Sequence, residues 1–489
     1  MVTVKSAFVL LTALSLGVQT AAFAKELEIG QATSEGTSIT IYNQNFGLVR
    51  DVRTLPLEKG VNFVRFSDVA AAIDPTSVSY TSLTAPNAVV VREQNYQYDV
   101  MSPETILSKS VGKEVTFRRY LNSSVSETRG ILLNPPQVTI VDTNGNPSTQ
   151  SVGLVLKTDS GIILNPSGES EVKELPPGLV PKPSLLWKLE TNKPGDHKSE
   201  IAYQTAGMSW KCDYVAIAND DDTKTDLTSW VTLNNECGAS FKNAALKLMA
   251  GDVNRVTAPA QPMYMKAARM EAANDMAQQF SEKSFAEYHL YTLAGTTDLN
   301  NHETKQMSLF NAAAVPTRKL YIYEPEMSQT YGGWSPQRNP QKVNVKIEVA
   351  NTKANNLGMA LPKGKVRVYK KDSDGSLQFI GEDLIDHTPS DEKIRLYIGD
   401  AFDLVGERKQ MTYTQVSDRK FKANYEISLR NRKKEGDVTI TAVEHSYGDW
   451  KINSSSHKYK KVDSNTFEFP VTVPAGAEVK IQYEVEVKS

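Results

Sequence analysis

This sequence has few cysteines, and its positive and negative charges nearly balance. The two cysteines, Cys212 and Cys237, cannot form a structural zinc site without histidine partners nearby. The 55 basic and 57 acidic residues give a net charge of −2, which supplies no bulk electrostatic reason to bind nucleic acid or an anionic membrane. Glycine and proline, at 28 and 23 residues, are near average usage, which excludes collagen-like and low-complexity chains.

Long apolar runs are also missing, apart from a short one at the N-terminus. Lys5 gives a positive start, Ala7 to Val18 is mainly apolar, and Ala22-Phe23-Ala24 has the small-x-small pattern of a cleavage site. This run is too short to span a bilayer, so it predicts a signal peptide cut after Ala24; the alternative is a buried N-terminal helix. The expected mature protein is exported, periplasmic or secreted, with no transmembrane segment.

The predicted compartment bears on the two cysteines. Cys212 and Cys237 lie 25 residues apart in a strand-rich region, and an oxidising compartment favours a disulfide between them. The chain-entropy model assigns such a bond roughly 3.5 kcal/mol, provided that the native geometry permits it. We therefore predict a Cys212–Cys237 disulfide.

Strand periodicity dominates the rest of the chain. Alternating polar and apolar residues, typical of half-buried strands, occur in Ser38 to Asn43, Val61 to Phe66, Lys342 to Val349, Lys365 to Tyr369, Lys393 to Ile398, Asp437 to Val443 and Glu478 to Val487. Turn residues such as Asp374-Gly375 and Pro474-Ala475-Gly476 separate these runs. The pattern predicts an all-β protein with several sandwich or barrel domains.

Helical signals are few. Ser102-Pro103-Glu104 has an N-cap residue, a proline at the first helical position and an early acid, which predicts a short helix to about Ser110. A second stretch, Met265 to Lys283, is rich in helix formers but has a poor apolar stripe. We predict a mobile or partly helical insertion at 258–283, with a Met-rich partner-binding helix as the alternative.

Proline clusters suggest where the domains divide. Pro176-Pro177-Gly178 and Pro181-Lys182-Pro183 interrupt the chain near residue 180. After the signal peptide, 1–24, we predict an N-terminal β domain at 25–180, which includes a possible small barrel at 113–175. A central β-sandwich region at 181–410 and a C-terminal β-sandwich at 411–489 would follow.

Several short motifs together resemble those of a known family. They are Ser38 to Asn43, Phe46 to Arg50, Ile73 to Val78, Leu185 to Trp187, Tyr203 to Trp210 with Tyr214, Trp230 to Asn235, Asn243-Ala244, Leu246 to Asp252, Glu287 to Tyr291, Lys305-Gln306, Leu361 to Gly364, Arg367 to Tyr369, Gly381 to Asp383, Asp386 to Thr388 and Gly399 to Asp403. The chain resembles an uncharacterised family of exported bacterial proteins with a domain of unknown function, shared with mucoidy-inhibitor-like proteins. The resemblance implies an all-β exported protein and supplies no catalytic residues. The long coiled-coil insertion of the mucoidy-inhibitor-like pattern is missing.

Catalytic and metal-binding motifs fail on inspection. His302-Glu303 begins like a zinc-protease helix, but Gln306 stands where the second histidine is needed. Asp372 to Ser376 resembles a calcium loop without its glycine and glutamate, and a hairpin turn accounts for the same residues. Asp220-Asp221-Asp222 could bind a cation weakly, although a solvated acidic loop explains it as well. The sequence predicts no metal site and no cofactor.

Two polar groups of residues remain as candidates. Strand alternation would place Glu287, His289 and Tyr291 on one face, where a carboxylate, an imidazole and a phenol could bind a ligand or move a proton. Asp386 and His387 follow Glu382 and Asp383 near a turn. The alternative for both groups is a buried hydrogen-bond network between strands.

Aromatic residues supply a last candidate surface. Trp210, Tyr214 and Trp230 could form a carbohydrate platform, although aromatic residues spaced along strands are usually core residues. From these patterns we expect a non-enzymatic exported protein with a binding or structural role in the bacterial envelope, with envelope proteins or glycans as partners. The alternatives are a hydrolase or metal-dependent enzyme using the Glu287, His289 and Tyr291 face, and a carbohydrate-binding module.

Overall fold

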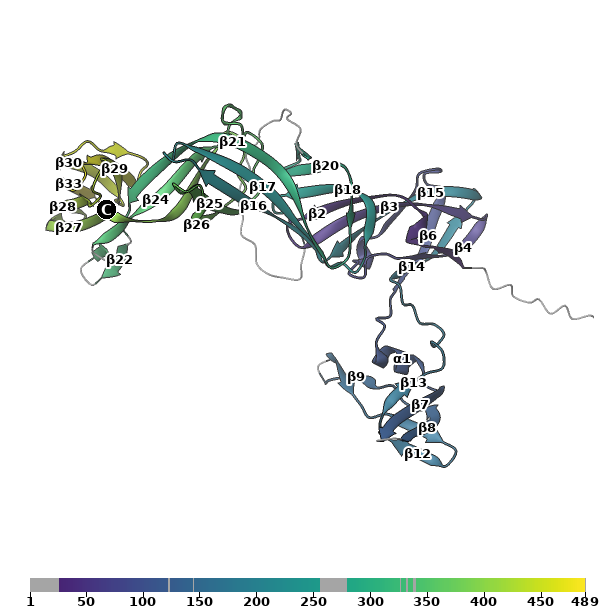
Figure 1. The fold of residues 1–489 in the computed structure, drawn as a ribbon. Helices are drawn as coiled ribbons and strands as arrows, with labels where there is room; N and C mark the ends of the chain where they lie inside the picture. The colour runs from purple at the N-terminus through teal and green to yellow at the C-terminus, as the bar shows by residue number, and fades with distance from the viewer. Residues whose placement is uncertain are drawn as a thin grey trace, which may run out of the picture. The chain divides into compact units, whose positions relative to one another are not determined.

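The protein is built almost entirely from β-strands (Figure 1). The computed structural model describes residues 26–488 apart from 122–123, 144, 256–278, 326, 331–332 and 337–339. Strands account for 66% of the residues and helices for 4%, which confirms the predicted all-β class. Each of the seven alternating runs named above lies in a strand to within one residue.

The chain divides into two compact units, neither of which is continuous in sequence. Unit 1 comprises residues 1–36, 51–71 and 75–202, and unit 2 comprises 37–50, 72–74 and 203–489. The predicted domain boundaries near residues 180 and 410 stay predictions.

Unit 1 contains a four-stranded sheet. Its order is β1 (Leu27–Ile29), β4 (Gly60–Ser67), β14 (Ser184–Thr191) and β6 (Val89–Gln97). Phe66 and Trp187 are buried on one face, with ring centroids 5.4 Å apart. Alternation in β14 explains this face, because Leu185, Trp187 and Leu189 are buried on it.

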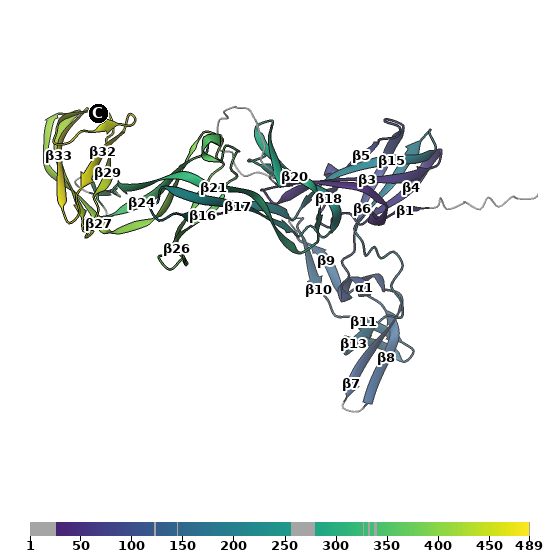
Figure 2. The same cartoon turned by 45° about the horizontal axis from the view of Figure 1, so that its top comes forward.

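Unit 1 also holds a five-stranded sheet with the single α-helix of the described residues (Figure 2). The order is β12 (Gly161–Leu164), β11 (Val155–Thr158), β8 (Ser124–Leu132), β7 (Glu114–Leu121) and β13 (Glu169–Glu171), next to a hairpin of β9 (Gln137–Val141) and β10 (Pro147–Ser151). β12 and β13 are its two edges, so these strands form an open sheet and not the small barrel considered from the sequence.

The predicted short helix is confirmed as α1 (Pro103–Lys109). The Ser102 side chain accepts a hydrogen bond from the Thr105 N–H, and Pro103 occupies the first turn. Leu107 packs against Phe117, Leu132 and Leu156 of the five-stranded sheet.

A seven-stranded sheet carries part of the candidate site. Its order is β19 (Phe280–Phe285), β20 (Tyr288–Leu299), β18 (Phe241–Ala250), β2 (Ser34–Tyr42), β3 (Phe46–Leu57), β15 (Gly195–Ala206) and β5 (Ser79–Ser82). The division between the two units falls within β2, β3 and β15. In unit 2, β2 pairs with β18 in parallel, which sets N-terminal residues beside a strand from the middle of the chain.

The largest sheet has thirteen strands and lies in unit 2. Its path is β26 (Leu377–Ile385), β25 (Gly364–Lys371), β16 (Met208–Ala218), β17 (Lys224–Asn235), β21 (Glu303–Tyr323), β24 (Gln341–Ala350), β27 (Lys393–Ser417), β28 (Lys420–Asn431), β33 (Glu478–Lys488) and β30 (Asp449–Ser455), with β29 (Val438–His445), β31 (Lys460–Lys461) and β32 (Thr466–Val473) off this path. β22 (Met327–Thr330) and β23 (Gly333–Pro336) form a separate hairpin.

The end of this sheet folds into a sandwich. β29 pairs with β32, while β27, β28, β33 and β30 form the facing layer. One continuous core joins them, with Phe467 and Phe469 of β32 packed against Tyr483 of β33. The core also includes Tyr323 and Val343 from earlier strands, so it is not confined to residues 411–489.

The predicted insertion at 258–283 lies mostly outside the described residues. Its last residues belong to the sheet, because β19 begins at Phe280 and continues to Phe285. β19 pairs antiparallel with β20, so the Met265 to Lys283 stretch ends as a strand. The predicted hairpin at Asp372 to Ser376 is confirmed between β25 and β26, with Gly375 in the left-handed region at φ 84°.

Candidate functional site

The predicted polar face of Glu287, His289 and Tyr291 is not formed as a set of three. Glu287 lies in the turn between β19 and β20 and is exposed. His289 and Tyr291 follow in β20, where His289 is partly exposed and Tyr291 is buried. The carboxylate expected on this face is therefore absent from it.

Glu282, on the neighbouring strand, supplies a carboxylate instead. Antiparallel pairing of β19 with β20 sets Ser284 opposite His289 and Glu282 opposite Tyr291. The Glu282 Oε1 atom lies 2.7 Å from His289 Nδ1. The sequence could not indicate this partner, because Glu282 stood in the expected insertion and its alternation is too short to fix a pairing register.

Tyr291 and Tyr214 use their hydroxyl groups to hold one segment of backbone. The Tyr291 hydroxyl donates to the Ala360 carbonyl, and the Tyr214 hydroxyl donates to the Pro362 carbonyl, both at 2.7 Å. Burial raises the pKa of each phenol well above its ordinary value. Both therefore stay protonated at neutral pH, and they act as structural hydrogen-bond donors.

The three aromatic residues of the predicted carbohydrate platform are not presented together. Trp210 is buried at 4% exposure, its ring edge packs on Tyr291, and its Nε1–H donates to the Met249 carbonyl. Tyr214 is fully buried. Trp230, in β17, is 40% exposed. A stacking surface made by all three side chains is excluded, because two of them are core residues.

His387 links three segments of unit 2. Its Nδ1 accepts a hydrogen bond from the Lys363 backbone N–H at 3.2 Å, and its Nε2 lies 3.4 Å from Asn43 Nδ2. The carboxylate of Asp386 accepts the His387 backbone N–H at 2.9 Å and thereby fixes the turn. Glu382 and Asp383, predicted nearby, have other partners, Lys365 and the Tyr397 backbone N–H.

The fold brings the two predicted histidines into electrostatic contact. Burial lowers the pKa of His387, the Lys363 ammonium lowers it further, and His289 acts in the same direction. Asp252 and Asp386 act in the opposite direction without reversing the shift. His387 is therefore neutral at pH 7, because its pKa lies below the ordinary value of 6.5.

We call the residues around these contacts the histidine cluster: Asn43, Asp252, Glu282, His289, Lys363 and His387. Lys363 and Asp252 form an exposed ion pair at 3.3 Å. The cluster and the Tyr214, Tyr291 and Trp210 anchors join six of the segments that carry the family resemblance: 38–43, 203–214, 246–252, 287–291, 361–364 and 386–388. These segments thus meet where distant strands are tied together.

The predicted disulfide between Cys212 and Cys237 is wrong, and both cysteines are free and buried. Cys212 of β16 pairs in register with Val231, while Cys237 follows the end of β17 at Asn235. The stretch from Val231 to Asn235 alone spans about 13 Å, whereas bonded cysteines need Cα atoms within about 7 Å. Cys212 Sγ instead lies 3.0 Å from Ser229 Oγ.

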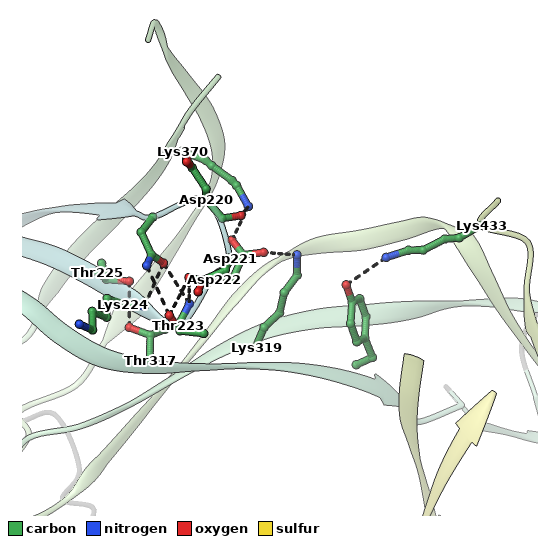
Figure 3. Close-up of polar contacts among 12 residues, drawn as sticks. Asp220, Asp221, Asp222, Thr223, Lys224, Thr225, Thr317, Lys319, Lys370 and Lys433 are labelled. Carbon is green, nitrogen blue, oxygen red and sulfur yellow. Dashed lines mark hydrogen bonds and ion pairs between the residues drawn. The ribbon is translucent and has the colours of Figure 1, made fainter. Parts of the chain in front are cut away.

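The acidic triplet at 220–222 forms the turn between β16 and β17 and serves an ion-pair network (Figure 3). Asp222 lies between two lysines, with carboxylate oxygens 2.9 Å from Lys319 Nζ and 2.8 Å from Lys370 Nζ. Asp221 accepts hydrogen bonds from Thr223. The triplet thus fastens the turn to β21 and β25.

Two further observations bear on ligand binding: the size of a cavity in unit 2 and the grouping of side chains that could ligate a metal. A cavity among β16, β17, β21, β24, β25, β26 and β27 is lined by apolar side chains such as Val368, Ile347 and Leu396. Its free volume of about 20 Å³ accommodates little more than one water molecule. Across the described residues, no three His, Cys, Asp or Glu side chains are grouped so that they could hold a metal ion.

Comparison with known proteins places most of the chain in one family. No helix within the described part of the chain has both the length and the hydropathy that a membrane span requires. A search of the curated proteins gives no match. Residues 199–489 match the family model described as Domain of unknown function (DUF4139). These residues make up more than half of the chain and contain both histidines of the cluster, and the chain belongs to the DUF4139 family.

Proposed function

We propose that this protein is an exported, non-enzymatic component of the bacterial envelope with a binding or structural role. The N-terminal charge, apolar run and Ala22-Phe23-Ala24 pattern support export. We further propose that it is related to mucoidy-inhibitor-like proteins, on the motif segments that meet around the histidine cluster. Its partners would be envelope proteins or glycans.

The structural role is supported by the hydrogen bonds that three buried aromatic side chains make. Tyr291, Tyr214 and Trp210 each donate a hydrogen bond to a backbone carbonyl of another segment. A buried phenol with a raised pKa and a satisfied hydroxyl contributes to fold specificity and offers neither a base nor a nucleophile. These residues support a scaffold in which distant strands are held at fixed positions.

Export is tested by fractionating cells that produce the full chain and sequencing the N-terminus of the recovered protein. A product that begins at Lys25 and is found outside the cytoplasm supports the proposal. Replacing Ala22 and Ala24 with bulky residues should leave the precursor uncleaved. An intact Met1 N-terminus on cytoplasmic protein would contradict the proposed location.

The enzymatic alternative is tested with variants that remove titratable groups and keep a polar side chain at each position. Glu282→Gln and His289→Gln keep the side-chain length or hydrogen-bonding capacity of a partly exposed pair. A non-enzymatic role predicts that either variant complements a deletion strain in envelope permeability to a hydrophobic dye. Failure of a variant that is exported and unfolds at the wild-type temperature would favour a catalytic or ligand-binding role for this pair.

A further inference from the structure

The position of His387 at the junction of three segments points to a conformational device. Its Nδ1 accepts the Lys363 backbone N–H, and only an unprotonated nitrogen can accept a hydrogen bond. A neutral imidazole that accepts at Nδ1 carries its proton on Nε2. His387 is therefore the Nε2–H tautomer while this contact is made.

The partner of Nε2 supports this assignment. Asn43 Nδ2 lies 3.4 Å from His387 Nε2, so two donor groups face each other. The Oδ1 atom of the same Asn43 amide is buried without a hydrogen-bond partner. A half-turn of the amide exchanges its oxygen and nitrogen. Nε2–H then donates to Oδ1, which removes the contact between two donors and gives Oδ1 a partner.

We propose that His387 is an acid-sensitive latch that joins the end of β2 and the residue before β25 to the turn at 386–388, and that protonation of its Nδ1 releases it. Protonation removes the acceptor for the Lys363 N–H and places a second donor in front of it. The new positive charge also lies near the Lys363 ammonium. Both effects favour the opened arrangement.

The charged groups around the latch belong to several elements. Asp252 follows β18, Lys363 precedes β25, Asp386 lies on the turn itself, and His289 comes from β20 with Glu282 of β19 beside it. Burial, Lys363 and His289 disfavour the imidazolium, while Asp252 and Asp386 favour it. The net effect of these groups lowers the pKa of His387, which agrees with a latch that is closed at neutral pH and opens on acidification.

Neighbouring contacts limit how far the opening spreads. The Leu361 N–H donates to the Thr388 carbonyl at 2.8 Å, and the Thr388 N–H donates to the Leu361 carbonyl at 2.9 Å. Neither bond involves a titrating group. We therefore expect loss of the Lys363 contact while the Leu361–Thr388 pair stays closed.

The test is residue-resolved amide hydrogen exchange of the purified mature protein between pH 7.5 and 4.5, corrected for intrinsic exchange rates. Uptake of one proton on opening predicts that the opening constant at Lys363 rises up to tenfold per pH unit between the ordinary pKa of histidine and its lowered value. Leu361 and Thr388 should change little. Equal loss of protection at all three amides would indicate local unfolding and would overturn the proposal.

Variants separate His387 from the other titrating groups. His387→Gln should abolish the pH dependence at Lys363, whereas His457→Gln, a histidine that bonds its neighbour Ser456 in an exposed loop, should leave it as in the wild type. Asn43→Asp should weaken the pH dependence at Lys363, because a carboxylate beside Nε2 favours the imidazolium of the closed latch and raises its pKa toward the ordinary value. A pH response that persists in His387→Gln and vanishes in His289→Gln would show that His289 is the switch, and it would overturn the proposal for His387.

A direct measurement covers the case in which His387→Gln folds poorly. Nitrogen-15 NMR of histidine-labelled wild-type protein, with the His387 ring assigned through its backbone, should show this ring as the Nε2–H tautomer at pH 7.5, titrating below 6.5. Failure to find such a ring would contradict the latch. The physiological use of the latch rests on the proposed export, because an exported protein meets the pH of the medium. The purified-protein experiments test the latch whether or not export is confirmed.

Discussion

The alternation of polar and apolar residues does not predict which charged side chains are buried. In unit 1, Arg53 is 1% exposed and donates to Asp51 and to the carbonyls of Ile29 and Ser67. In the C-terminal sandwich, Arg408 Nε lies 2.9 Å from both carboxylate oxygens of Glu444. Each charge is tolerated because its hydrogen bonds are satisfied within the core.

Removing one charge of the Arg408–Glu444 pair should destabilise the sandwich strongly. Glu444 is 3% exposed and also accepts the Tyr483 hydroxyl at 2.6 Å. Glu444→Gln removes the buried carboxylate that pairs with Arg408, which costs about 3–5 kcal/mol. Hydrogen exchange in β28 and β33 would report the local free energy of unfolding.

A matched control uses an exposed pair of the same kind. Arg92 and Glu190 are 2.7 Å apart with side chains about half exposed, so Arg92→Gln should cost less than about 1 kcal/mol. The double variant Arg408→Met with Glu444→Leu should recover part of the loss, because it removes both charges but leaves the Tyr483 hydroxyl without this acceptor. An effect of Glu444→Gln no larger than that of Arg92→Gln would contradict a buried ion pair.

The two cysteines should be unreactive in the native protein. Burial raises the pKa of both thiols to about 11, so little thiolate, the reactive form, is present at pH 8. Iodoacetamide should label neither residue in native protein and both after unfolding in urea without reductant. A mass shift of two protons lost, with no labelling after unfolding, would restore the disulfide.

At the level of elements, turns are fixed by contacts with strands that are distant in the sequence. Asp222 sits in the left-handed region at φ 58°, which Asn and Asp tolerate better than other side chains. Its carboxylate connects the β16–β17 turn to Lys319 of β21 and Lys370 of β25. The turn thus ties β25 to β21, two strands separated by β16 and β17 in the sheet.

Replacement of Asp222 should separate its charge from its backbone geometry. Asp222→Asn keeps the left-handed preference and loses the charge, for a cost of about 1 kcal/mol. Asp222→Ala should cost about 1 kcal/mol more, because alanine is strained at positive φ. Thermal unfolding of both variants measures the difference. Equal effects would mean that the charge alone matters.

The same carboxylate predicts a dependence on pH. Burial raises the pKa of Asp222, but hydrogen bonds from Lys370 and Lys319 outweigh it, and the net shift is downward. A lowered pKa contributes stability above the unfolded value of 3.8 that is lost as the pH falls through the folded pKa. Below pH 4 the wild type should therefore lose its advantage over Asp222→Asn, as measured by thermal unfolding.

At the scale of the whole molecule, both large sheets combine strands from either side of residues 256–278. β18 pairs with β20 in one sheet, and β16 and β17 pair with β25 and β21 in the other. Each of these pairs joins a strand that precedes residue 256 to a strand that follows residue 278. Chain continuity at 256–278 is therefore not what holds unit 2 together.

Cleavage between residues 256 and 279 should leave two associated fragments. Trypsin acting at Lys266 or Arg269, or a specific protease acting at a site inserted there, should give fragments that co-elute in gel filtration and separate only in denaturant. The register contacts of β16, β17 and β18 supply the association. Fragments that part in native buffer would show that these pairings are weaker than the structure indicates.

Features that depend on neighbours along the chain could be predicted from the amino-acid sequence. Alternation placed the strands at 38–43, 365–369 and 478–487, and Ser102 with Pro103 placed the start of α1, because periodicity and capping act over a few residues. Which strands pair could not be predicted in this way and is known from the three-dimensional fold. In the fold the carboxylate beside His289 belongs to Glu282 and not to the predicted Glu287. Cys212 and Cys237 lie too far apart for a disulfide. His289 lies close enough to His387 to lower its pKa. Register and sheet order rest on side-chain packing between segments far apart in sequence, which a local pattern does not encode.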